Sequence, residues 1–375
     1  MLQYTFNPYW KIVKTGINKS NPSRENMTEE ITSIETVLNS RCSSGFEVGI
    51  NKRHWGILTS KIPEATKINK ILSLLQIPRF SEGKLQNWFE GERLFLGFQA
   101  DNDTVVNRIL NIESGMQQQA LNLYCTAFKL GLGTINQGID GTPYGEKIAA
   151  TSYIIRETLP SYKRGFFTTS KPGQPRSFKS SKKLSDPNRE STQDFFTNMP
   201  SLTSSSNKGS QASENDKSQL LWAAKGRTPH LIRLQVLKMM WGLTIPTWKG
   251  GQDYTRVHLI TGKKNYLYTN LTKGIIPKSI VPQQISWIQG RPTHDLEQIG
   301  EINIDNMLDG FCNAIILCNN ENTNKSLWEI GYMLENLFLQ AKSLQIIFKS
   351  KIFSQSEIQE IGNKGLSNPV AAVMF

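Results

Sequence analysis

The sequence predicts an α+β protein in which mixed or antiparallel strands surround two long central helices. Residues 329–344 carry apolar side chains at steps of three and four, which is the spacing of a helix with one wide apolar face. Residues 113–132 show a similar pattern earlier in the chain. Each segment is expected to follow a strand and to precede another, and this order favours an α+β plan over a doubly wound one.

The two long helices also resemble each other in sequence. Aligning Gly115 with Gly331 places Glu113 on Glu329. We therefore interpret the chain as a tandem duplication, with two halves that form a pseudo-dimer and pack their central helices across a pseudo-twofold interface.

The remaining elements follow from apolar spacing, from alternation and from turn residues. We expect helices at 28–40, 64–75 and 220–224, strands at 93–99, 149–156, 314–318 and 369–374, and a hairpin with arms at 256–260 and 266–268. The first long helix is expected to end at Gly131 and Gly133, because glycine is the usual residue of a left-handed helix cap.

Composition suggests where the two halves divide. Serine, lysine, proline and asparagine dominate residues 161–219, and this low-complexity basic stretch predicts a linker or disordered loop. The first half is then expected at 36–160 and the second at 220–375, after an N-terminal extension at 1–35.

Charge and cysteine content narrow the classes of partner. The formal net charge is +12, which could indicate a polyanionic partner. Residues 162–219 hold ten Lys or Arg against five Asp or Glu, so part of the charge lies in the low-complexity stretch. The charge of the rest of the chain is unremarkable, and we do not expect nucleic-acid binding. The longest apolar runs, such as 314–318, are too short for a membrane span, and we expect a cytoplasmic protein without a membrane partner. Four cysteines without CxxC spacing and four scattered histidines predict neither a zinc site nor any other metal site.

The common motifs of nucleotide, phosphate and hydrolase sites are missing from the sequence, which favours chemistry carried by a bound cofactor. The first candidate is the turn at 241–253. Pro246 would fix the chain there, and Gly250 and Gly251 would let the backbone approach a flat ligand. The alternative is an ordinary glycine loop before a strand.

The second candidate is SRCSSG at 40–45. Arg41 supplies a fork of charged donors and Ser43 a hydroxyl group, and such groups near a helix end suit a phosphate. An arginine beside serines in a surface turn is also common, so this signal is weak by itself.

Several of these stretches together resemble the nitroreductase family of flavoproteins, and in particular the azoline dehydrogenases of peptide maturation. SRCSSGF resembles the opening Arg-Arg-Ser turn of the family, and LLWAAKG is typical of the azoline branch. GMQQQALNLYCTAFKLGLGT and GYMLENLFLQAKSLQI resemble its central helix, and PVAAVMF resembles its terminal strand.

The resemblance implies FMN bound at the interface between two copies of the fold. By analogy, Arg41 and Ser43 would hold the flavin phosphate, while the turn after Pro246 would lie against the flavin ring. The cofactor-binding residues that it implies are Arg41, Ser43, Pro246, Thr247, Gly250 and Gly251. Cys42 stands where the family has its second arginine, and Ser44 or Gly45 stands where a third is expected, so two charged donors to a phosphate are missing.

The function so implied is that of an FMN-dependent oxidoreductase that transfers a hydride through flavin N5, in a dehydrogenase or nitroreductase type of reaction. The substrate would be a small molecule or a peptide, with a nicotinamide donor as a further partner. No catalytic side chain is assigned, although His230 or Tyr254 could relay a proton. The alternative is a flavin-free relative that acts as a scaffold partner in a biosynthetic assembly.

Overall fold

The computed structural model describes most of the chain. The described residues are 33–41, 62–75, 80, 85–90, 93–136, 148–157, 181–189, 193–235, 238–246, 255–271, 275–277, 287–289, 292–320 and 323–375.

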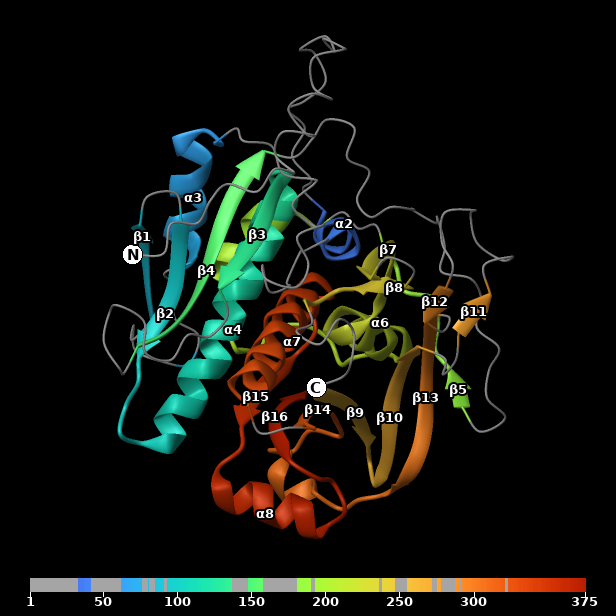
Figure 1. Ribbon diagram of the computed structural model, residues 1–375. Coiled ribbons are helices and arrows are strands. Elements are labelled where there is room, and N and C mark those ends of the chain that lie inside the picture. Colours follow the sequence, from blue (N-terminus) through green and yellow to red (C-terminus); the bar gives the residue numbers. More distant parts are fainter. Residues whose placement is uncertain are drawn as a thin grey trace.

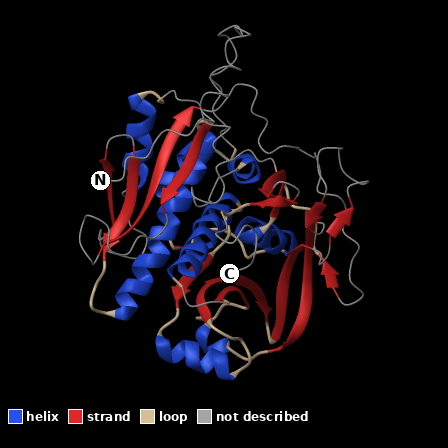
Figure 2. Ribbon diagram, in the orientation of Figure 1, coloured by secondary structure: helices blue, strands red, loops and turns tan. Residues whose placement is uncertain are grey.

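Two long helices lie side by side at the centre of the molecule, with strands on both sides of the pair (Figures 1 and 2). These helices are α4 (Thr104–Ala127) and α7 (Asn324–Ser343). The other helices are α2 (Ile34–Ser40), α3 (Ala65–Leu75), α5 (Phe195–Asn198), α6 (Glu214–Lys225) and α8 (Gln355–Asn363), with 3-10 turns η4 (Met199–Ser201) and η6 (Asp305–Met307).

Three sheets surround the helices. A four-stranded antiparallel sheet has the order β1-β2-β4-β3, with β1 (Leu85–Glu90), β2 (Arg93–Gln99), β3 (Leu130–Asn136) and β4 (Ile148–Glu157). A second four-stranded sheet has the order β11-β12-β8-β7, with β7 (Arg227–Gln235), β8 (Lys238–Leu243), β11 (Ile275–Pro277) and β12 (Trp287–Gln289). Its β12 and β8 run parallel.

The largest sheet has eight strands in the order β5-β13-β10-β9-β14-β16-β15-β6. Its members are β5 (Ser181–Lys183), β6 (Ser205–Ser206), β9 (Thr255–Thr261), β10 (Lys264–Leu271), β13 (Pro292–Glu301), β14 (Asn313–Asn319), β15 (Phe348–Ile352) and β16 (Pro369–Met374). Because antiparallel pairing predominates and helices pack between the sheets, the α+β prediction is confirmed.

One strand arrangement occurs twice. In the first sheet, β2 precedes α4 and β3 follows it, while β4 pairs between these two strands. In the largest sheet, β14 precedes α7 and β15 follows it, while β16 pairs between them. Each arrangement has a further antiparallel strand at its side. In the first sheet β1 pairs with β2, and in the largest sheet β9 pairs with β14. The order β1-β2-β4-β3 therefore matches β9-β14-β16-β15 in pairing, and in both sheets a central helix connects the second strand of this order to the fourth.

The central helices approach closely at two glycines. A Cβ atom added at Gly331 would lie 2.0 Å from the carbonyl oxygen of Ile112, and one added at Gly115 would lie 2.3 Å from that of Trp328. Ile112 and Trp328 each precede their own helix's glycine by three positions. The contact is thus reciprocal, and it is possible only because glycine has no side chain.

The central strands of the largest sheet are buried on both faces. Ile315 and Leu317 on β14 face the main core with the central helices, whereas Ala314 and Ile316 face a second core. Helix α8 covers that second core through Ile361. Burial on both faces explains why this strand is apolar along its length rather than alternating.

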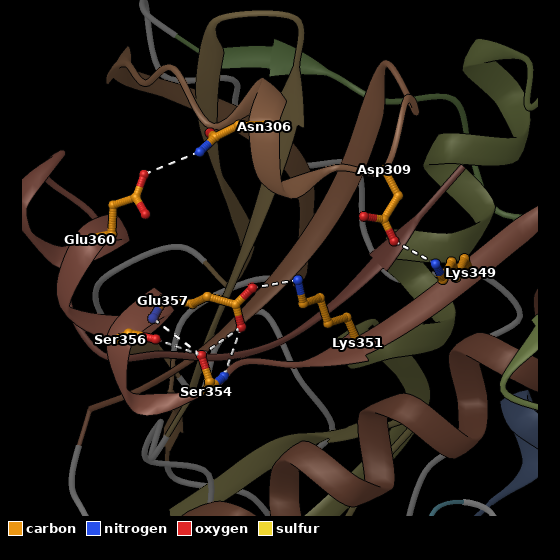
Figure 3. Close-up of polar contacts among 8 residues, drawn as sticks. All are labelled: Asn306, Asp309, Lys349, Lys351, Ser354, Ser356, Glu357 and Glu360. Carbon is orange, nitrogen blue, oxygen red and sulfur yellow. Dashed lines mark hydrogen bonds and ion pairs between the residues drawn. The ribbon is translucent and has the colours of Figure 1, made fainter.

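Polar contacts join α8, β15 and the residues around η6 near the surface (Figure 3). Lys349 donates to Asp309 at 2.5 Å, and Lys351 forms an ion pair with Glu357. Glu357 also closes a capping box with Ser354 at the start of α8. The pair of Lys351 with Glu357 joins β15 to the start of α8, and ion pairs near the surface contribute at most about 1 kcal/mol each.

Most predicted elements are found within one or two residues of their expected bounds. The strand predicted at 93–99 is β2, the helix at 64–75 is α3, the last strand is β16, and the hairpin is β9 with β10. Gly262 takes the left-handed conformation in the hairpin turn, with φ +56°. The helix predicted at 28–40 appears as α2 in its described part.

The predicted end of the first long helix is wrong. Helix α4 ends at Ala127, and Leu130–Asn136 form β3 instead. The left-handed residue is Lys129, with φ 56°, whereas Gly131 and Gly133 pair with β4. Leu130 and Leu132 fit helical spacing as well as strand alternation, so apolar spacing alone could not separate the two possibilities.

The expected linker differs in its C-terminal part. Residues 181–189 and 193–219 contribute β5, α5, β6 and the start of α6, whereas residues 161–180 of the expected linker lie outside the described residues. Phe195, Met199 and Leu202 are buried in the main core. Three apolar anchors within a serine-rich stretch hold this part of the chain in place, although its average composition resembles that of a linker. No helix in the described part of the chain is long and apolar enough to cross a membrane.

Candidate functional site

Three successive backbone carbonyls, from the last residue of β8 onward, each accept hydrogen bonds from side chains. Arg41 donates from Nη2 to the carbonyl oxygens of Leu243 at 2.6 Å and Ile245 at 2.8 Å. The Thr244 carbonyl between them accepts from Gln119 Nε2 and from Asn336 Nδ2, both at 3.1 Å. These contacts fix the backbone of the segment, because each carbonyl has a specific donor.

The donors to the Thr244 carbonyl come from both central helices. Gln119 lies on α4 and Asn336 on α7, and they also bond to each other at 2.7 Å. Asn336 Nδ2 further donates to the carbonyl of Ala223 on α6 at 2.9 Å. All three side chains that hold the segment, including Arg41, are buried. We call Arg41, Gln119 and Asn336 the carbonyl clamp.

Helix α6 completes the attachment of this segment. The amide of Thr244 donates to the Gly226 carbonyl at 3.0 Å, and its hydroxyl donates to the Trp222 carbonyl at 3.3 Å. Trp222 belongs to the phrase LLWAAKG and is buried. The segment 243–246 therefore lies where α2, α4, α6 and α7 come together.

The structure brings two of the predicted cofactor residues together. Arg41 bonds to Ile245, the residue before Pro246, and Pro246 is itself buried. The other four predicted residues, Ser43, Thr247, Gly250 and Gly251, lie outside the described residues, as does Tyr254. His230 lies on β7.

Arg41 as a whole residue is 2% exposed. In this position it holds the backbone at Leu243 and Ile245. Its predicted contact with a phosphate stays a prediction.

The sequence analysis did not predict the buried polar side chains of the central helices. Gln118 Oε1 accepts from the hydroxyl groups of Tyr153 at 2.8 Å and Tyr332 at 2.7 Å, next to the carbonyl clamp. Burial raises the pKa of Tyr153 well above its ordinary value, so this hydroxyl stays protonated as a donor. The available signal was the run of three glutamines, 117–119, within an otherwise buried helix.

A buried lysine and a buried glutamate lie on either side of one threonine. Lys225 Nζ donates to the carbonyl of Thr255 at 2.7 Å and to its Oγ1 at 2.9 Å. The Thr255 hydroxyl in turn donates to Glu329 Oε2 at 3.2 Å. This chain of contacts links Lys225 on α6 to Glu329 on α7 through Thr255.

The described residues contain no group of three or more His, Cys, Asp or Glu side chains that could hold a metal ion. The two buried thiols, Cys125 and Cys318, have pKa values raised by burial, the latter to about 12. They are therefore protonated at neutral pH and are poor nucleophiles.

Solved structures similar to this chain are described as nitroreductases. One from Ralstonia eutropha JMP134 is 16% identical, with a TM-score of 0.36, and the match covers 55% of this chain and 93% of that chain. One from Anabaena variabilis ATCC 29413 is 10% identical, with a TM-score of 0.48, and the match covers 75% of this chain and 68% of that chain. One from Thermotoga maritima MSB8 is 11% identical, with a TM-score of 0.39, and the match covers 94% of this chain and 99% of that chain.

No protein-family model matches the sequence, and no curated protein matches it. Because all three TM-scores are below 0.5, the likeness to these solved structures supports neither the fold nor the function of this chain.

Proposed function

We propose that this chain is a nitroreductase-like FMN oxidoreductase whose cofactor site lies where the segment 243–246 meets the central helices. The contact of Arg41 with Leu243 and Ile245 is the observation that carries the proposal. The sequence resemblance assigns Arg41 to the phosphate and Pro246 to the ring of one flavin. These residues are about two hundred positions apart, and two hydrogen bonds join their neighbourhoods.

The proposal includes a duplicated architecture, in which the two halves form a pseudo-dimer within one chain. The repeated strand order around α4 and α7 supports it, as does the reciprocal contact of Gly115 and Gly331. The carbonyl clamp supports a site that needs both halves, because Gln119 and Asn336 come from different central helices.

The described residues fit FMN in part. Pro246 would end a rigid segment against the ring, and Arg41 would supply positive charge toward the phosphate. FMN, when bound, supplies hydride transfer through N5. The part of this chain is to hold the segment with the carbonyl clamp and to keep water away from it by burial. The substrate would be a small molecule or a peptide, and a nicotinamide would be the donor.

A second candidate function is a flavin-free relative that serves as a binding partner or scaffold. The hydrogen bonds of Arg41 favour this function, because its Nη2 already donates to two backbone carbonyls and the residue is almost fully buried. A phosphate would compete with these carbonyls for the guanidinium. Cys42 in place of a second arginine points the same way.

A titration of the purified chain with FMN and with riboflavin separates the two functions. A flavoprotein binds FMN and binds riboflavin more weakly, because only FMN carries the phosphate. We expect Arg41→Ala to weaken FMN binding by about tenfold or more. If the wild-type chain binds neither flavin, the scaffold function is the better account.

Arg108→Ala is the matched control for this titration, because Arg108 also donates from Nη2 to a backbone carbonyl, that of Val370, away from the site. We expect its FMN affinity to equal that of the wild type. If Arg41→Ala also keeps the wild-type affinity, the phosphate role of Arg41 is wrong, although flavin binding itself would stand.

A further inference from the structure

Helix α2 buries a stripe of side chains that ends in an arginine. Ile34, Val37, Leu38 and Arg41 recur at steps of three and four, so they lie on one face of the helix. All four are buried, and the first three belong to the main core. Because Arg41 is the C-cap residue of α2, the position of the helix determines where its guanidinium group meets the carbonyls of the segment 243–246.

The other end of α2 carries a buried acid. Glu35 lies in the first turn, and its Oε1 atom accepts from Gln340 Nε2 at 2.7 Å and from Ser343 Oγ at 2.8 Å. Both donors belong to α7. Glu35 is 2% exposed, and its Oε2 atom has no hydrogen-bond partner. The carboxylate therefore attaches the start of α2 to α7.

One face of α7 contacts both α2 and the segment 243–246. Asn336, Gln340 and Ser343 lie four and three positions apart, so these buried polar side chains share one face of the helix. Asn336 donates to the segment directly, whereas Gln340 and Ser343 donate to Glu35. The same stripe of α7 thus reaches the segment by two routes, and the second route runs through α2.

The direction of the hydrogen bonds requires an acceptor at position 35. The backbone amide of Asn188 can only donate, and it donates to Gln219 Oε1 at 2.8 Å. Gln219 Nε2 then donates to Gln340 Oε1 at 3.2 Å, and Gln340 Nε2 donates to Glu35. An ionised carboxylate offers only acceptors, so Glu35 suits the end of this chain. An apolar side chain at this position would leave buried donors of α7 without their acceptor.

The apolar contacts of α2 hold it in the core but do not fix its position along α7, because the hydrophobic effect is non-directional. Hydrogen bonds fix that position, because they depend on distance and angle. We propose that Glu35 is a positioning residue of the candidate site, which acts through α2 to hold Arg41 against the segment 243–246. That the segment belongs to a cofactor site rests on the proposed function, whereas its attachment through Glu35 does not.

Hydrogen exchange of the full chain, measured by mass spectrometry, tests this role without flavin. Glu35→Met nearly keeps the length of the side chain and removes the acceptor. We expect the amides of Thr244 and Ile245 to exchange about fivefold faster or more in this variant, because the segment opens more readily. Glu35→Gln keeps an acceptor oxygen for α7, and its exchange should stay close to the wild-type rate.

Two further variants separate positioning from a general loss of stability. Arg41→Met should also speed exchange of the segment, and adding Glu35→Met to it should bring no further change there, because Glu35 acts through Arg41. Ile361→Val is the matched control, because it removes a buried methyl group from the second core, away from the segment. Exchange of the segment should then equal that of the wild type.

Four results would each overturn the proposal. Glu35→Met could leave exchange of the segment at the wild-type rate, or Glu35→Gln could exchange as fast as Glu35→Met. The effects of Glu35→Met and Arg41→Met could add in the double variant, or Ile361→Val could speed exchange of the segment equally. Because none of these measurements uses flavin, a failure of FMN binding would count against the proposed function alone.

Discussion

Gly115 and Gly331 lie against each other where α4 crosses α7. A Cβ atom on Gly331 would stand 2.8 Å from the Cα atom of Gly115. Both glycines are buried within long helices, where glycine costs about 1 kcal/mol relative to alanine. Close approach of the two backbones offsets that cost, because it lets the helices pack in direct contact.

Gly331→Ala should therefore destabilise the protein strongly. The new methyl group would meet the Ile112 carbonyl, and overpacking of this kind costs about 1–3 kcal/mol or more. Gly362→Ala is the control, because Gly362 lies in α8 with nothing within 4 Å of its added Cβ, and it should be neutral or stabilising. Urea unfolding measures both, and equal effects would contradict a close helix crossing.

The carbonyl clamp makes a second prediction about stability. Asn336→Ala removes a donor to the Thr244 and Ala223 carbonyls and the acceptor of Gln119, which should cost about 2–4 kcal/mol of unfolding free energy. Asn306→Ala removes an exposed contact with Glu360 and should change stability by less than about 0.5 kcal/mol. A similar small loss for both variants in chemical denaturation would show that the clamp contributes little.

Asp295 predicts an unusual dependence of stability on pH. It is fully buried, neither carboxylate oxygen has a partner, and burial raises its pKa. As pH rises above about 4, the unfolded chain gives up this proton before the folded chain does, so the carboxyl group costs stability. Asp295→Asn should raise the melting temperature at pH 7, and the gain should vanish near pH 4.

Asp305→Asn provides the comparison, because Asp305 is exposed. It should not raise the melting temperature at pH 7. Loss of stability in Asp295→Asn at pH 7 would mean that the charged carboxylate has a stabilising role.

His294 acts in the opposite direction. Its folded-state pKa of about 3 lies below the ordinary value of 6.5, so the unfolded chain takes up a proton first as the pH falls. Stability should decline below about pH 6.5, by up to about 1.4 kcal/mol per pH unit from this group. Melting curves of His294→Gln between pH 7 and 4 should show a shallower decline, and an unchanged slope would rule out this contribution.

Sequence patterns predicted the elements whose periodicity is strong. Spacing of three and four marked α7, alternation marked β2, and the alignment of Gly115 with Gly331 named the residues that touch. The anchors Phe195 and Leu202 were hidden by the polar residues around them. In such a segment a few buried side chains determine the structure, and average composition does not reveal them.

The candidate site was predictable only in part. The resemblance pointed to Arg41 and Pro246, and the structure places them as near neighbours. The clamp formed by Gln119 and Asn336 could not be predicted, because each donates to a carbonyl far away in the sequence and backbone acceptors leave no mark on residue type.

Retention of FMN by the purified wild-type chain tests the central claim most directly. After incubation with FMN and gel filtration, we predict that a flavin absorbance band near ~450 nm travels with the protein. A colourless protein peak, with all of the flavin eluting separately at every concentration tried, would contradict the claim.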